Sequence, residues 1–298
     1  MRDILILPTL GFFSNDEDSA SRIDCMIQLA KDPLTRPDIA PIDTGSTNLE
    51  TFDPATGVFG HADRVYRNDT HALQHYARLL KTVGIKPKLV CWSIGFVRRA
   101  AALMDAGLVD EPGYFLLNMT DGPYITGHPG TPTGLQALVD FLPKNRKCVW
   151  TANIVGGSLV DLAACVARLG GNIAPGIGDY PYLELSSPPN EVVIQRVAEI
   201  ARAGGTSLSP ITFAECSTCR RARVVDVTLT YGSSRFADQS PRCEKVSGSG
   251  HQSWLCAGRQ DRGVLYRSPR KKAAISAANT LGCSIAAKCP PFAIGVQR

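Results

Sequence analysis

The sequence predicts an α/β protein built around a parallel sheet. Short aliphatic segments of strand length alternate six times with longer segments whose apolar residues recur every three or four positions. This alternation is typical of parallel sheets covered by helices. The composition agrees, because 44% of the 298 residues are hydrophobic and 20% are charged, as in an ordinary globular protein.

The expected elements follow one another in a regular order. The first strand is a four-residue aliphatic run stopped by Pro8, and Gly84 and Gly107 end two of the helices. The six strands are 4–7, 39–43, 88–92, 114–119, 148–154 and 172–177, and their helices are 16–31, 69–83, 97–106, 135–142, 159–169 and 191–203. Right-handed crossovers are expected throughout. Periodicity alone leaves open whether the sheet closes into a barrel.

Residues that directly follow the strands are the first candidates for a site, because the carboxyl ends of parallel strands line the ligand crevice. The stretch 170–184 is the most informative one. A short strand ends there in a glycine turn that presents Asp179, Tyr180 and Tyr182. Asp179 is therefore the first catalytic candidate, although a role in ordering the turn or capping the next helix explains it equally well.

Four further residues are candidates for contacts with a substrate. Thr9, Ser46 and Asn48 follow other strands, where their side chains would hydrogen-bond a carboxylate or ketone, although such residues more often stabilise turns. His128 lies in the loop after the fourth strand, in the sequence Gly-His-Pro-Gly-Thr. A substrate contact and a local hydrogen bond in a proline-stiffened loop explain His128 equally well.

Charge and cysteine usage change near residue 215. From Cys216 onward there are fourteen Lys and Arg against four acids, whereas the chain before it has 18 basic and 23 acidic residues. Six of the ten cysteines also fall after Glu215. We therefore expect a domain at 1–215 and a basic, cysteine-containing tail at 216–298 that is poorly ordered. Cys216 and Cys219 lack a second compact ligand pair for a structural zinc site.

The sequence suggests a cytoplasmic protein with no membrane segment. No apolar run approaches the ~20 residues of a membrane helix, and the amino-terminal residues are too short and too acidic for a secretory signal. The four cysteines before residue 215 lie in apolar stretches, where cysteine usually acts as a small buried hydrophobe.

An ordered set of short motifs resembles the β-keto acid cleavage enzymes, whose first described member is the 3-keto-5-aminohexanoate cleavage enzyme. The motifs are at 45–48, 84–87, 105–108, 127–131, 141–143 and 170–180. The resemblance implies a (β/α)8 TIM barrel, Zn²⁺, acetyl-CoA as co-substrate, and usually a homo-oligomer. It also implies an exchange in which a β-keto acid and acetyl-CoA give a new CoA thioester and acetoacetate. His128 then becomes a candidate contact to CoA, and the glycine turn 155–158 a weak candidate for a phosphate cradle.

The chain also departs from this pattern. Its six βα units correspond to an incomplete barrel whose first two units are missing. The family's His-x-His pair is absent among the five histidines, and Gly178 stands where a metal-binding glutamate is expected. Ala174 and Pro175 stand where an arginine is expected. His71 and His75 lie four residues apart on a helix, where a surface role is more common than metal binding. No metal ligand is therefore assigned.

Three hypotheses remain open from the sequence. The first is a β-keto acid cleavage enzyme in which Asp179 takes up the acid proton. The second is a catalytically inactive protein that binds a carboxylate or an acyl-CoA. The third, a nucleic-acid-associated protein, depends on the basic run of Arg267, Arg270, Lys271 and Lys272, and nucleic acid is an unlikely partner.

Overall fold

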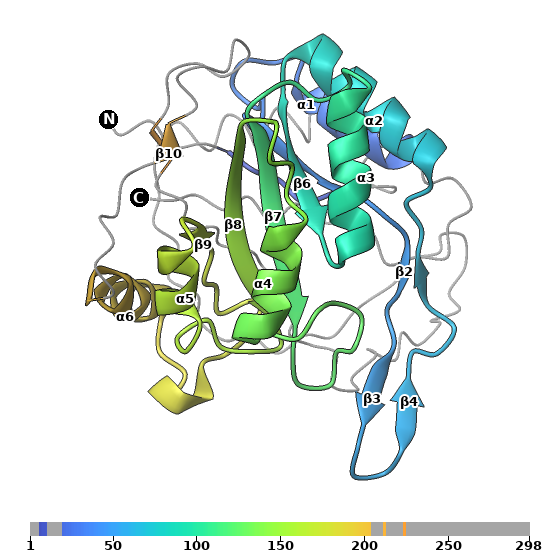
Figure 1. The fold of residues 1–298 in the computed structure, drawn as a ribbon. Coiled ribbons are helices and arrows are strands. Elements are labelled where there is room, and N and C mark those ends of the chain that lie inside the picture. The colour runs from blue at the N-terminus through green and yellow to red at the C-terminus, as the bar shows by residue number, and fades with distance from the viewer. Residues whose placement is uncertain (1–5, 11–19, 204–210, 213–222, 225–298) are drawn as a thin grey trace, which may run out of the picture. The chain divides into compact units, whose positions relative to one another are not determined.

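A five-stranded parallel sheet forms the centre of the computed structural model, which describes residues 6–10, 20–203, 211–212 and 223–224 (Figure 1). The strand order is β1-β6-β7-β8-β9, so neighbouring strands follow one another along the chain. The strands are β1 (Ile39–Asp43), β6 (Lys86–Cys91), β7 (Gly113–Thr120), β8 (Cys148–Val155) and β9 (Asn172–Ile173). Each pair is parallel. The predicted parallel α/β class is therefore confirmed.

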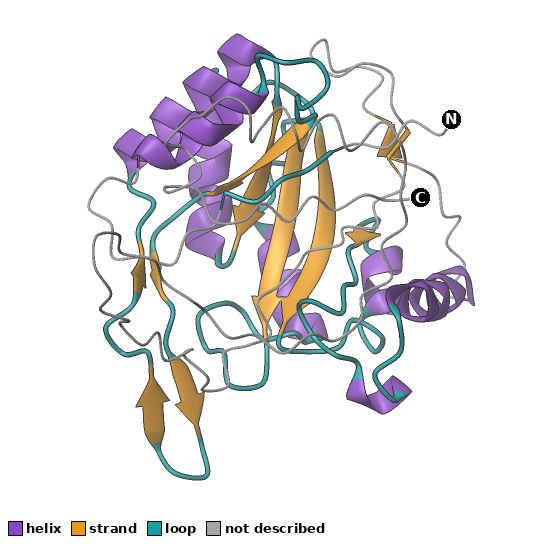
Figure 2. Ribbon diagram, turned by 180° about the vertical axis from the view of Figure 1, so that it is seen from behind, coloured by secondary structure: helices purple, strands orange, loops and turns teal. Residues whose placement is uncertain are grey.

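Helices connect the strands and cover one face of the sheet, as Figures 1 and 2 show from opposite sides. They are α1 (Asp24–Leu29), α2 (Thr70–Val83), α3 (Ile94–Asp105), α4 (Pro132–Asp140), α5 (Ala163–Arg168) and α6 (Asn190–Ala203), with short 3₁₀ turns at Ala20–Ile23 and Leu183–Leu185. Helix α6 packs against α5. The main core lies between helices and sheet, where Leu73, Leu80, Leu89, Phe115 and Leu117 are fully buried.

The two faces of the sheet differ in chemistry because side chains alternate along each strand. Residues facing the helices are apolar and belong to the core: Ala40, Ile42, Leu89, Cys91, Phe115, Leu117, Met119, Ala152 and Ile154. The opposite face carries buried polar residues: Lys86, Lys88, Asn118, Thr120, Thr151 and Asn153, together with Tyr114. We call this second face the polar face of the sheet.

Helix α2 shows how local sequence sets the boundaries of an element. The Asp69 carboxylate accepts a hydrogen bond of 3.0 Å from the backbone N–H of Ala72, which caps the first turn. Gly84 ends the helix in the left-handed conformation, with φ 64°. Between these signals, Leu73, Tyr76 and other apolar residues at helical spacing are buried against the sheet.

Two small antiparallel pairs lie between β1 and α2, where no element was expected from the sequence. Strand β2 (Thr47–Asn48) pairs with β5 (Val65–Tyr66), and β3 (Thr51–Asp53) pairs with β4 (Val58–Gly60). Their periodicity is too short to detect from sequence. A further pair joins β10 (Ile211–Thr212) and β11 (Arg223–Val224).

Three expected elements prove clearly shorter than predicted among the described residues. The helix expected at 16–31 is α-helical only over Asp24–Leu29, after the 3₁₀ turn at Ala20–Ile23. The strand at 172–177 ends after Ile173, because Ala174 still donates its N–H to Ala152 at 3.0 Å but Pro175 has no N–H to continue the ladder. The helix expected at 159–169 begins only at Ala163. Residues 159–162 form a bend and a turn instead, in which Leu159 and Leu162 are buried.

The amino-terminal strand and the carboxyl-terminal tail fall largely outside the described residues. Ile6 and Leu7 are not in a strand, although the Ile6 carbonyl accepts hydrogen bonds from the N–H groups of Asp38 and Ile39 beside β1. The described strands form an open sheet consistent with part of a TIM barrel. The incomplete (β/α)8 barrel without its first two units and the boundary at residue 215 therefore remain predictions. None of the described helices has the length and apolar character needed to cross a membrane.

Candidate functional site

Hydrogen bonds join the loops at the carboxyl edge of the sheet into one layer. After β1, the Ser46 hydroxyl accepts a hydrogen bond of 2.8 Å from the backbone N–H of Asn68. The carbonyl of Asn48 accepts one of 2.9 Å from the hydroxyl of Thr126, which lies in the loop after β7. The loops that follow β1 and β7 are therefore tied together across the strand between them.

The same layer continues towards β9. The N–H of His128 donates to the carbonyl of Trp92, after β6, at 3.2 Å, and the N–H of Thr120 donates to the carbonyl of His128 at 2.9 Å. At the far side, the N–H of Gly156, after β8, donates to the carbonyl of Asp179 at 2.9 Å. Backbone bonds of this kind fix the loops without using the polar side chains of His128 and Asp179.

The structure thus brings four of the five predicted site residues to one edge of the sheet: Ser46, His128 and Asp179 lie in loops, and Asn48 lies in the short strand β2. Ser46 and Asn48 are exposed, and His128 and Asp179 are half-buried. Thr9 is exposed as well, but residues 11–19 after it are outside the described part of the chain. These positions confirm the rule that strand ends gather polar residues; the roles of the residues remain predictions.

Asp179 is close enough to Tyr182 to influence its ionisation. Tyr182 is buried, and this burial is the main reason that its pKa is raised, with the negative charge of Asp179 adding to the effect. A carboxylate at the end of a strand, beside a buried phenol, is a group that can accept a proton from an acidic carbon.

Asp43 forms a second polar centre that the sequence did not single out. Its carboxylate accepts hydrogen bonds from the indole N–H of Trp92 at 2.6 Å and from the hydroxyl of Tyr66 at 2.8 Å. Desolvation by burial raises the pKa of Asp43, while these two bonds and the charge of Arg22 oppose the rise. Asp43 is the last residue of β1, so the same strand-end rule that selected Asp179 would have found it.

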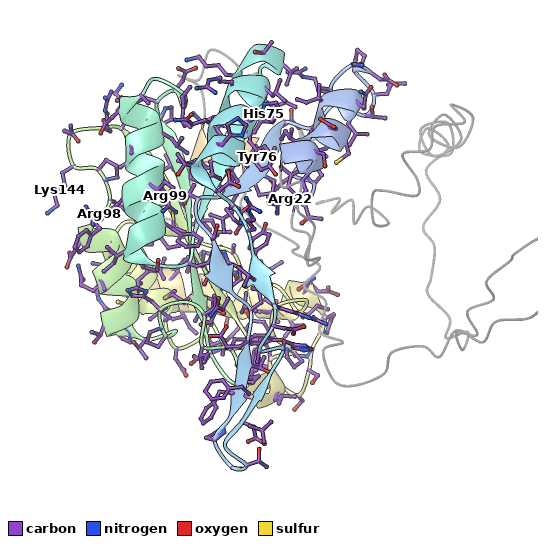
Figure 3. All side chains as sticks on the ribbon, turned by 90° about the vertical axis from the view of Figure 1, so that its right-hand side faces the viewer. Arg22, His75, Tyr76, Arg98, Arg99 and Lys144 are labelled. Carbon is purple, nitrogen blue, oxygen red and sulfur yellow. The ribbon has the colours of Figure 1, made fainter. Side chains whose placement is uncertain are left out.

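Arg22 links this centre to the first helices. Its guanidinium lies 5.2 Å from the centroid of the Tyr66 ring and 5.9 Å from that of Tyr76, within the range of cation–π attraction. It also donates to the side-chain oxygen of Asn68 at 2.8 Å. Figure 3 shows Arg22 and Tyr76 close together at the amino-terminal helices. Arg22 therefore supplies a positive charge beside Asp43 rather than a free binding group.

The described residues do not provide a metal site of the kind that the resemblance implies. No group of three or more His, Cys, Asp or Glu side chains in this part of the structure is placed to hold a metal ion. His71 and His75 on α2 therefore have no third ligand among the described residues. At the edge of the sheet, Gly178 precedes Asp179 and offers no donor side chain. The donor set does not fit zinc, and no step is derived through a metal.

The glycine turn at 155–158 is also not a phosphate cradle at a helix start. Gly156 has a positive φ of 81° and uses its N–H for the bond to Asp179. Helix α5 begins only at Ala163 and has six residues. The turn therefore connects strand and helix without presenting helix-terminal amides to a ligand.

Fold and site together define a parallel α/β protein whose polar loops gather at the carboxyl edge of the sheet, the usual place of an active site in such proteins. The model of the beta-keto acid cleavage enzymes matches residues 1–218. The chain belongs to this family, as the motif order predicted.

Curated relatives support the same assignment at low identity. The chain is 23% identical over 184 residues to a 3-oxoadipate:acetyl-CoA acetyltransferase of Cupriavidus necator, covering 59% of this chain and 58% of the relative. It is 25% identical over 162 residues to a 3-dehydrocarnitine:acetyl-CoA trimethylamine transferase of Rhizobium meliloti, covering 53% and 51%.

A third relative is the kind of enzyme that was described first in this family. The chain is 21% identical over 165 residues to a 3-keto-5-aminohexanoate cleavage enzyme of Fusobacterium nucleatum, covering 54% of this chain and 57% of the relative. The matches thus span between half and three-fifths of the length of these relatives.

Proposed function

We propose that this protein exchanges acyl groups between a β-keto acid and acetyl-CoA. The acyl group of the β-keto acid moves to the sulfur of CoA, and the acetyl group joins the released two-carbon carboxylate unit to form acetoacetate. One carbon–carbon bond and one thioester bond break, and one of each forms, so atoms and electrons balance without an oxidant or reductant. The family match over residues 1–218 is the observation that carries this proposal.

Asp179 is the residue that we propose accepts the proton. It follows β9 at the carboxyl edge. Its backbone N–H donates to the carbonyl of Gly176, and its carbonyl accepts from the N–H of Gly156. These bonds fix the backbone that carries the carboxylate, and general base catalysis requires a base within hydrogen-bond reach of the proton that it accepts. Ser46, Asn48, His128 and Thr9 are proposed to bind the substrate carboxylate, the ketone or CoA.

A second candidate function is binding of a carboxylate or an acyl-CoA without turnover. Cleavage next to a ketone develops negative charge on the ketone oxygen, which needs a stabilising electrophile. Gly178 stands where the resemblance expects a metal-binding glutamate, and it offers no ligand for such an electrophile. This difference favours the binding function.

Mass spectrometry of the reaction products tests the two candidates together. The purified full-length chain is incubated with acetyl-CoA and 3-oxohexanoate, and the mixture is examined for butyryl-CoA and acetoacetate. Formation of both products in equal amounts supports acyl exchange. Tight binding of 3-oxohexanoate or acetyl-CoA by calorimetry without either product supports the binding function, and absence of both binding and products rejects the two candidates.

A further inference from the structure

Two buried amide side chains form a pair on the polar face of the sheet. Asn118 on β7 and Asn153 on β8 are register partners near the carboxyl ends of their strands. They are 4% and 3% exposed, respectively. The Nδ2 of Asn153 donates a hydrogen bond of 2.9 Å to the Oδ1 of Asn118.

This bond leaves the pair incompletely satisfied. The Oδ1 of Asn153 is fully enclosed and accepts no hydrogen bond in the described structure. A buried amide oxygen without a donor is unfavourable, and the great majority of such atoms in folded proteins are paired. A purely structural pair would be expected to satisfy both amides, so the unused acceptor indicates a place for an external donor.

The neighbours of the pair are consistent with a small polar ligand. Ala174 donates its backbone N–H to the carbonyl of Ala152, the residue before Asn153, at 3.0 Å, and its side chain is a methyl group without polar atoms. The indole N–H of Trp92, which directly follows β6, is already used by Asp43. The amides hydrogen-bond to no carboxylate among the described residues, so the pair is electrically neutral.

We propose that the Asn118 and Asn153 amides form a subsite for a neutral hydrogen-bond donor, such as a hydroxyl group, on the acyl chain of the substrate. Because Asn153 Oδ1 is enclosed, the groups that cover the pair must move aside when the hydroxyl enters. The hydroxyl then donates to Asn153 Oδ1, and its oxygen accepts from the amide nitrogen of Asn118. A buried ammonium group would need a counter-charge that the pair does not offer. The inference rests on the proposed function, and it selects β-keto acids that carry a hydroxyl group over plain aliphatic ones.

Calorimetry without CoA measures this preference directly. The full-length chain is titrated with 3-oxohexanoate, 5-hydroxy-3-oxohexanoate and 5-amino-3-oxohexanoate. We expect the hydroxyl compound to bind about two- to tenfold more tightly than 3-oxohexanoate, the range of one net hydrogen bond. Equal binding of these two compounds, or tightest binding of the amine, overturns the proposal.

Two substitutions assign the preference to the amide pair. Asn153→Leu should reduce the affinity for the hydroxyl compound to that for 3-oxohexanoate, without changing the latter. Thr151→Val is the matched control, because Thr151 lies two residues before Asn153 on β8 and faces the same side of the sheet. This control should keep the hydroxyl preference; a loss of preference in both variants overturns the assignment.

Thermal unfolding separates failure of the subsite from failure of the proposed function. The double variants Asn118→Leu/Asn153→Leu and Asn118→Ala/Asn153→Ala remove both amides together, so that no unpaired partner remains. If the amide pair serves ligand binding rather than stability, at least one double variant should have a melting temperature equal to or above that of wild type. If both melt several degrees lower, the pair is structural and the subsite is rejected. If none of the three acids binds wild type, the proposed function is rejected whatever the melting temperatures show.

Discussion

The indole N–H of Trp92 donates a hydrogen bond of 2.6 Å to the carboxylate of Asp43, and this bond joins the ends of β1 and β6. The hydroxyl of Tyr66 donates to the other carboxylate oxygen at 2.8 Å. A buried donor, Tyr66, and a half-buried one, Trp92, thus depend on one carboxylate. The carboxylate thus links the segment that contains Tyr66 to the end of β6. At that end, the carbonyl of Trp92 also accepts the N–H of His128.

Asp43→Ala should destabilise the fold strongly. The substitution leaves the N–H of Trp92 and the O–H of Tyr66 without their acceptor, and each buried unpaired donor costs about 1–3 kcal/mol. We expect a loss of about 3 kcal/mol in the free energy of unfolding, measured by urea denaturation. Asp161→Ala is the control, because Asp161 is exposed in a turn and should leave the urea midpoint unchanged. Similar midpoints for Asp43→Ala and wild type would contradict a structural role.

The raised pKa of Asp43 predicts a defined pH dependence. Burial, the largest influence, moves the pKa above its ordinary value of 3.8, so the folded chain holds this proton more tightly than the unfolded chain. Folding therefore takes up a proton between pH 3.8 and the raised pKa, and stability falls as pH rises through that window. Above the raised pKa, this contribution is constant.

Asp43→Asn isolates this effect because asparagine does not titrate. Urea unfolding of both proteins at a series of pH values gives the difference in the free energy of unfolding, wild type minus variant. We expect this difference to decrease as pH rises from about 4 and then to level off. A difference that grows with pH would show that the hydrogen bonds from Trp92 and Tyr66 outweigh burial.

The sequence was sufficient to predict the architecture where elements are long and periodic. The strand at Ile39–Asp43 has the predicted bounds, and the strands β6, β7 and β8 differ from them by a few residues at most. Errors arise where one residue overrides the pattern, as Pro175 does at the end of β9. The short pairs β2–β5 and β3–β4 escaped prediction because two or three residues show no alternation.

The site was predicted only as far as the strand-end rule reaches. This rule selected Ser46, Asn48, His128 and Asp179, which the structure places at the carboxyl edge of the sheet. The amide pair of Asn118 and Asn153 was not found, because both residues lie inside apolar strands. Only the register between β7 and β8 brings the two amides side by side, and register depends on tertiary packing that a single sequence does not reveal.

Asp69→Ala should weaken the start of α2. The Asp69 carboxylate accepts the N–H of Ala72 at 3.0 Å, and loss of such a cap costs about 0.5–2 kcal/mol. Asparagine keeps a capping oxygen, so Asp69→Asn should restore most of the stability in urea denaturation. If the asparagine variant is as unstable as the alanine variant, the charge of Asp69 matters more than its capping bond.

Asp179→Asn should stop acyl exchange while leaving the fold intact. Asparagine keeps the size of the side chain and the backbone bond to Gly156, but it cannot accept the substrate proton. General base catalysis contributes about 10²- to 10⁴-fold, so we expect the turnover number to fall by at least 100-fold with little change in KM. Product formation is measured by mass spectrometry against the control Asp161→Asn, and an unchanged rate would place the base elsewhere.

Tyr182 reports on the same substitution in the absence of any reaction. Burial raises the pKa of Tyr182 most, and the negative charge of Asp179 raises it further. Removing that charge should allow Tyr182 to ionise at lower pH, which ultraviolet titration of the phenol near its alkaline end point detects. The shift requires a folded protein because the unfolded chain does not hold these residues together. A variant that shows the shift and lacks exchange therefore locates the proton acceptor at Asp179, whereas loss of exchange without the shift would indicate that the edge of the sheet has rearranged.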